Sequence, residues 1–99
     1  MEYNKQQESR IKIAVSEYMV RNNHLIPIQL MADPEALQHI TNIGTSIVMN
    51  NWGINTQPGG FVKAVLDNNL EAAVGKADDV NRQLLPFYVT LKYNLEYVA

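Results

Sequence analysis

The sequence predicts an all-α protein, a compact bundle of four or five helices in one domain over residues 1–99. Apolar residues recur at intervals of three and four in several segments, which is the spacing of one helix face. The triplet Asp33-Pro34-Glu35 is a strong helix-start signal. Residues 24–32 could be a strand, but no second strand is evident to pair with it. A chain of 99 residues leaves little room for a second domain.

The first helix is expected from about Lys5 to Arg21. Glu8 and Lys12 stand in the favourable order for an ion pair between successive turns. Asn22-Asn23 follows, and asparagine tolerates the left-handed conformation that ends helices. The face expected to be buried comprises Ile11, Val15, Tyr18 and Met19.

Residues 24–32 are ambiguous, because Leu25, Ile26, Ile28 and Leu30 fit a short strand as well as a helical turn. Pro27 lacks the backbone N–H that a paired strand needs. The favoured interpretation is a helical turn that starts at Pro27 and serves as a buried connector.

The second long helix is expected from Pro34 to about Asn51, with Asp33 as N-cap and Trp52-Gly53 closing it. Gly44 inside this helix costs about 1 kcal/mol relative to alanine, unless it permits a close helix crossing. The apolar face comprises Leu37, Ile40, Ile43, Gly44, Ile47 and Val48.

The second half of the chain contains shorter helical segments. One follows Pro58 and ends at Asp67-Asn68-Asn69, and another runs from Leu70 to Val74 and stops at Gly75. Asp78 (or Ala77) opens a last helix that reaches about Asn94. Since Pro86 falls inside that pattern, the last helix is expected to be kinked or split in two near Arg82 to Pro86.

The central part of the chain is poor in charge. Between Asn22 and Val62 there is no lysine or arginine, and Asp33 and Glu35 are the only carboxylates. Surfaces of small domains carry about 25–35% charged residues. We therefore expect this segment to be buried, either within the fold or in a homo-oligomer, and the apolar tail Tyr93–Ala99 to dock on a neighbour or on the body.

Composition narrows the possible partners. The net charge is −2 and no two of the eight basic residues are adjacent, which disfavours DNA and RNA binding. The absence of cysteine excludes disulfides and thiolate sites. No apolar run suits a membrane span or a signal peptide, so a cytoplasmic location is expected.

The segment Gln57-Pro58-Gly59-Gly60-Phe61-Val62-Lys63 is the candidate ligand site. The first N–H groups of a helix are unpaired, and two glycines let an anion approach them closely. Lys63 could reach that anion, and the candidate binding residues are Gln57, Gly59, Gly60, Lys63 and Arg82. The alternative is a tight connector whose glycines let two helices pass, because no phosphate-binding motif is complete here.

Enzyme activity, a cofactor and a metal site are not expected. His24 and His39 have no ligand partner at metal-site spacing, and Glu35 is the expected ion-pair partner of His39. Asp78 and Asp79 are expected to cap a helix rather than act as acid and base. The serines have no nucleophile-elbow context.

The segment Pro58–Leu70, followed by Ala73-Val74-Gly75-Lys76-Ala77-Asp78 and Asn81, resembles a signature of short uncharacterised helical proteins of bacteriophages and prophages. The likeness covers about the C-terminal 40 residues. Asn69 stands where that pattern usually has an acid. The resemblance implies a small accessory phage protein in the host cytoplasm, with no activity to transfer.

Two functions are compatible with these features. The first is non-enzymatic binding of a small anionic, nucleotide-derived ligand, such as a host-defence signal that a phage protein could sequester. The alternative is a protein–protein interaction module that inhibits or redirects a host protein through an apolar patch. The first is slightly favoured, since the glycine corner identifies particular residues.

Overall fold

The computed structural model describes residues 5–54 and 58–95, and in these residues it contains seven α-helices, one 3₁₀ turn and no strand. The predicted all-α class is therefore confirmed, whereas the count of four or five helices is too low. The elements are α1 (Lys5–Arg21), η1 (Asn23–Leu25), α2 (Ile28–Met31), α3 (Pro34–Asn51), α4 (Gly60–Leu66), α5 (Leu70–Lys76), α6 (Asp79–Gln83) and α7 (Leu85–Asn94).

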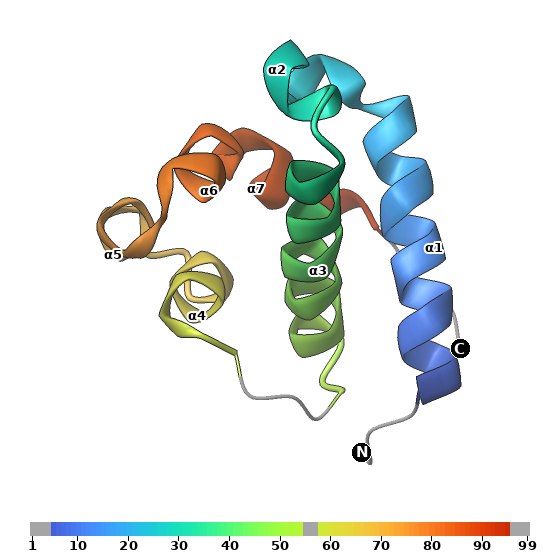
Figure 1. Ribbon diagram of the computed structural model, residues 1–99. Helices are drawn as coiled ribbons and strands as arrows, with labels where there is room; N and C mark the ends of the chain where they lie inside the picture. The colour runs from blue at the N-terminus through green and yellow to red at the C-terminus, as the bar shows by residue number, and fades with distance from the viewer. Residues whose placement is uncertain (1–4, 55–57, 96–99) are drawn as a thin grey trace.

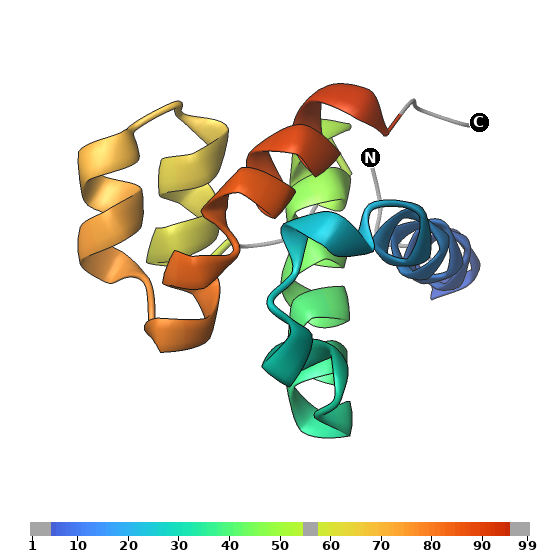
Figure 2. The same ribbon diagram turned by 90° about the horizontal axis from the view of Figure 1, so that it is seen from above.

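Helix α3 is the central element (Figure 1). Helix α1 packs along one side of it, and the hairpin of α4 and α5 lies on the other side. Helix α7 crosses α3, as the view from above shows (Figure 2). The short α2 lies at the end of α3 where that helix begins.

The surrounding helices explain why the central segment is poor in charge. Helix α3 buries seven of its residues, and Ile40 and Ile47 have no exposed surface at all. The helices that cover them belong to the same chain, so burial within the fold accounts for the low charge of this inner face. Gln29, Gln38 and Asn42 of the same segment are exposed and uncharged, and burial does not account for them. The predicted homo-oligomer stays a prediction.

Gly44 lies where three helices meet. A Cβ atom on Gly44 of α3 would lie 2.9 Å from Cγ1 of Val15 on α1 and 3.1 Å from Cδ2 of Leu91 on α7. Contacts this short would force a neighbour to move. The close helix crossing that the glycine was expected to permit is therefore present.

The helix ends follow local sequence signals. Oδ1 of Asp33 accepts hydrogen bonds from the N–H groups of Glu35 (3.0 Å) and Ala36 (3.4 Å), so Asp33 is the N-cap of α3 as predicted. At the other end Gly53 adopts a φ of 78°, and the N–H of Ile54 reaches the carbonyl of Met49 at 2.9 Å. This is the Schellman closure of a helix.

The same closure ends α4. Asn68 has a φ of 59°, its N–H bonds to the carbonyl of Val65, and the N–H of Asn69 bonds to that of Ala64. Asn69 then caps α5, because its Oδ1 accepts the N–H of Ala72 at 3.0 Å. Asparagine thus supplies the capping oxygen of α5.

Several boundaries differ from the predictions. The turn predicted at Pro27 is α2, with Pro27 as its N-cap residue, and Ile28 is 82% exposed rather than buried. Helix α5 passes through Gly75 and ends at Lys76. The predicted split of the last helix is confirmed, because α6 and α7 are divided at Leu84, within the stretch Arg82 to Pro86, and Pro86 fits the first turn of a new helix.

No helix in the described part of the chain is both long enough and apolar enough to cross a membrane. The predicted docking of the tail concerns residues 96–99 for the most part, which lie outside the described residues.

Candidate functional site

The glycine corner begins α4 as predicted. Gly59 is the N-cap residue and has no side chain to accept a hydrogen bond from the first turn, and Gly60 is the first helical residue. Phe61 and Val62 turn inward and are buried. Gln57 lies outside the described residues.

The sequence predicts Lys63 and Arg82 as the two cations at this corner, but the structure places only Lys63 on α4. Lys63 is exposed on α4, one turn after Gly60. Arg82 is engaged elsewhere, since its guanidinium bonds to Oδ1 of Asp79 (3.2 Å) and to the carbonyl of Ala77 (3.1 Å).

Lys76, which the sequence analysis did not consider, lies against Gly60. From the Cβ position that a side chain at Gly60 would occupy, Cδ of Lys76 is 2.9 Å away and Nζ is 3.7 Å away. Lys76 is sixteen positions further along the chain and lies on the other arm of the hairpin. Only the α4–α5 fold brings its ammonium group to the corner.

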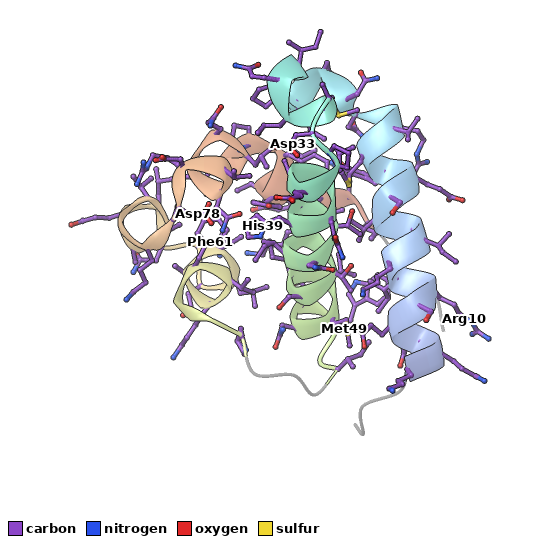
Figure 3. The ribbon with its side chains drawn as sticks, viewed as in Figure 1. Arg10, Asp33, His39, Met49, Phe61 and Asp78 are labelled. Atoms are coloured by element: carbon purple, nitrogen blue, oxygen red, sulfur yellow. The ribbon has the colours of Figure 1, made fainter. Side chains whose placement is uncertain are left out.

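A second polar cluster connects α3, α6 and α7. Oδ1 of Asp78 accepts the N–H of Asn81 at 2.7 Å, which confirms the predicted capping role. Oδ1 of Asn81 accepts the hydroxyl of Tyr88 at 3.1 Å in a buried hydrogen bond. His39 contacts Asp78 rather than the expected Glu35. Figure 3 labels His39 on α3 and Asp78, the N-cap residue of α6, together with Phe61 on α4, whose ring packs against that of Tyr88.

The His39–Asp78 contact is close but not a hydrogen bond. Nε2 of His39 lies 3.3 Å from Oδ2 of Asp78, yet it is a buried nitrogen with no hydrogen-bond partner among the described residues. The two atoms are therefore near each other without being aligned.

Tyr88 anchors this cluster in the core. Its side chain is fully buried and its ring meets those of Phe61 and Phe87 edge-on, with centroid distances of 5.7 and 5.8 Å. Burial, and then the negative charge of Asp78, raise the pKa of the Tyr88 hydroxyl well above its ordinary value. The aromatic side chains are therefore packing residues here, and Tyr88 keeps its proton.

A hollow lies between α4, α5 and α7, and we call it the α4–α5–α7 hollow. Its volume is about 180 Å³. Asn68, Asn69 and Lys92 contribute polar atoms at its wall. Its apolar wall includes Ala64, Leu70, Ala73, Leu85, Val89 and Tyr93.

Two apolar ridges stand around the hollow. On α5 they are Leu70 and Val74, which are 68% and 39% exposed, and on α7 they are Val89 and Tyr93, which are 41% and 77% exposed. Each pair is four residues apart, so each forms a ridge along one helix face. Three of the four side chains line the hollow itself. A surface of large apolar side chains around a depression is typical of a protein-binding site.

Lys92 holds the hollow together. Its Nζ donates to the carbonyls of Val65 and Leu66 at 3.2 Å and to Oδ1 of Asn68 at 2.8 Å. The ammonium group therefore satisfies the C-terminal carbonyls of α4 and ties α7 to the hairpin.

Neither the hollow nor Lys76 was identified from the sequence. The i,i+4 pairs Leu70–Val74 and Val89–Tyr93 were visible there, but nothing local shows which apolar residues a fold leaves uncovered. In the described residues no three histidine or acidic side chains gather as a metal site.

Comparison of the chain with protein-family models, with curated proteins and with solved structures gave no match.

Proposed function

We propose that this chain is a small non-enzymatic interaction module that binds another protein through the α4–α5–α7 hollow and its two ridges. The observation that carries the proposal is the exposure of Leu70, Val89 and Tyr93 around one depression. Side chains of this size cost free energy in water, at roughly 25 cal/mol per Å² of apolar surface. A partner that covers them recovers that free energy on binding.

The volume of the hollow also favours this function over storage of a free ligand. Small-molecule sites commonly enclose about 300–1,000 Å³. The α4–α5–α7 hollow encloses about 180 Å³. A depression of this size suits one side chain of a partner, whose remaining contacts would be made on the ridges.

The proposed function is tested by capture of proteins from an extract of the source organism with matched variants. Val89→Asp places a charge on the wall of the hollow, whereas Ile13→Asp makes the same kind of change on α1 at a residue that is 61% exposed and does not line the hollow. We expect a partner to be retained by the wild-type chain and by Ile13→Asp and to be lost with Val89→Asp. Equal capture by all three chains would contradict the proposal.

Binding of a small anionic, nucleotide-derived ligand is the second candidate. The observation that favours it is the approach of Lys76 to Gly60, because it adds a second cation to the corner that carries Lys63. The candidate residues are then Gly59, Gly60, Lys63 and Lys76. Gln57 and Arg82 are the other two residues that the sequence predicts for this site.

A thermal-shift panel of cyclic and linear nucleotides tests this candidate. A ligand held at the corner should raise the melting temperature of the wild-type chain and of Val89→Asp, and Lys63→Ala or Lys76→Ala should abolish the shift. No shift with any nucleotide would remove this candidate and leave the protein-binding proposal standing.

A further inference from the structure

We propose that His39 and Asp78 form a pH-dependent latch, which fastens the start of α6 to α3 when the imidazole is protonated and loosens it when the imidazole is neutral. This latch is a conformational device of the fold and is independent of the proposed function. Three observations carry it, namely the surroundings of Nε2 of His39, the position of the Asp78 carboxylate and the attachment of α6.

Nε2 of His39 is enclosed although the rest of the ring is not. The side chain is 39% exposed, so protons from solvent can reach the ring. Nε2 itself is buried, has no hydrogen-bond partner among the described residues and lies 3.3 Å from Oδ2 of Asp78 (Figure 3). Water therefore does not compensate this nitrogen, and the charge that it meets is that of Asp78.

The protonated ring suits this position better than either neutral form. A neutral imidazole carries one proton, on Nδ1 or on Nε2. With the proton on Nδ1, the lone pair of Nε2 faces a carboxylate oxygen and is repelled by it. With the proton on Nε2, the ring offers a donor without a charge. Only the protonated ring combines an N–H on Nε2 with a positive charge beside Asp78.

The carboxylate of Asp78 is held in place by its other oxygen. Oδ1 accepts the N–H of Asn81 at 2.7 Å and caps α6, whereas Oδ2 is the oxygen that approaches His39. One carboxylate thus connects the first turn of α6 with a side chain of α3. Between about pH 5.5 and 8 histidine is the side-chain type that changes its charge, so this connection changes in that range.

Helix α6 depends on such contacts because it is short. It has five residues, and Asn81 is the buried one. It packs on α7, where Oδ1 of Asn81 accepts the hydroxyl of Tyr88. An isolated helix of this length is not stable in water. A change in the contact at its start therefore changes how often α6 opens.

The other charged groups around the contact do not replace Asp78. Glu35 lies one turn before His39 on α3, and on α6 the carboxylate of Asp79 pairs with Arg82. Helix α2 carries no charged residue, and α1 lies on the side of α3 away from the α4–α5 hairpin (Figure 1). The remaining groups are Lys63 on α4, which is exposed, and Tyr88 on α7, which keeps its proton.

The direction of the effect follows from proton linkage. Docked α6 places a negative charge beside His39, so the docked form binds the proton more tightly than the open form. Docking is therefore favoured at the lower end of the histidine range and becomes weaker as the pH rises through it.

The latch is tested by amide hydrogen exchange of the full chain at about pH 5.5 and about pH 8, on either side of the histidine transition. Protection is expressed relative to an unstructured peptide at the same pH. The reporters are the N–H groups of Asn81, Arg82 and Leu84, which donate to Asp78 and Asn81. The ratio of protection at the two pH values is compared between chains, because a variant that weakens α6 equally at both pH values leaves it unchanged.

We expect protection of these amides in wild type to be about two- to fivefold greater at the lower pH, the range for a partly exposed ion pair. His39→Gln should remove this excess. Asp78→Asn should remove it as well, since asparagine keeps a capping oxygen and lacks the charge. The matched control is His24→Gln, because His24 is the other histidine of the chain and is exposed in η1, and it should keep the wild-type ratio.

The thermal unfolding of the variants is measured first, and if His39→Gln does not fold, Asp78→Asn decides. A wild-type ratio in His39→Gln, or greater protection of wild type at the higher pH, would contradict the latch. Loss of the excess with His39→Gln but not with Asp78→Asn would also overturn it, because the proton would then act through another group. Glu35→Gln should leave the ratio unchanged.

Discussion

Replacement of Gly44 by alanine is predicted to destabilise the fold, although alanine is the better helix former. The new Cβ atom would lie 2.9 Å from Cγ1 of Val15 and 3.1 Å from Cδ2 of Leu91. Both neighbours have no exposed surface. They cannot move toward solvent, so the side chains of Val15 and Leu91 must shift within the dense core or α1 or α7 must move with them.

Two opposing effects set the magnitude. Alanine gains about 1 kcal/mol over glycine in a helix interior. Overpacking of a dense core costs about 1–3 kcal/mol. We expect the free energy of unfolding to fall by about 1 kcal/mol, which lowers the melting temperature of a domain of this size by about 4–8 °C.

Urea and thermal unfolding followed by circular dichroism measure this change. Gly75→Ala is the matched control, because Gly75 lies in α5 and has no atom within 4 Å of its Cβ position. The control should become more stable, by up to about 1 kcal/mol. In a Val15→Ala background the penalty of Gly44→Ala should shrink. A gain in stability for Gly44→Ala equal to that of Gly75→Ala would refute the reasoning.

Three further predictions concern single groups. Gly53→Ala should lower the free energy of unfolding by about 1–2 kcal/mol. The cause is the left-handed backbone alone, because nothing lies within 4 Å of the Cβ position. A urea midpoint equal to that of wild type would contradict this. Above about pH 10 the free energy of unfolding should fall by up to about 1.4 kcal/mol per pH unit, since the unfolded Tyr88 loses its proton while the buried one, with its raised pKa, keeps it. Tyr88→Phe should remove this pH dependence of the free energy of unfolding, whereas the exposed control Tyr93→Phe should leave it in place. Urea titrations at alkaline pH measure both variants. Lys92→Met should lower the free energy of unfolding by about 1 kcal/mol, because three hydrogen bonds are lost. Amide hydrogen exchange in α4 and α5 should become faster. Unchanged exchange in these helices would show that the hairpin holds without Lys92.

Much of the fold could be predicted because its signals are local. Asp33 and Asp78 cap their helices through N–H groups two or three residues away, and that geometry is encoded in the sequence around them. Gly44 was expected to permit a crossing, because a glycine inside an apolar helix face needs a compensating contact.

What could not be predicted depends on pairs distant along the chain. His39 lies one turn from Glu35 but contacts Asp78, and Lys76 reaches Gly60 across the hairpin. Such pairings are decided by how helices stack, and spacing in the sequence carries no information on them.

Helix α5 contributes a single residue, Ala73, to the interior. The outward positions of this helix are therefore free of demands from the core, whereas position 73 needs a small residue, Ala72 packs partly against the core and Asn69 caps the helix. Substitutions at Leu70 and Val74 could accumulate with little effect on folding, so under the proposed function a change of partner could be reached by altering this one helix while the rest of the scaffold stays as it is.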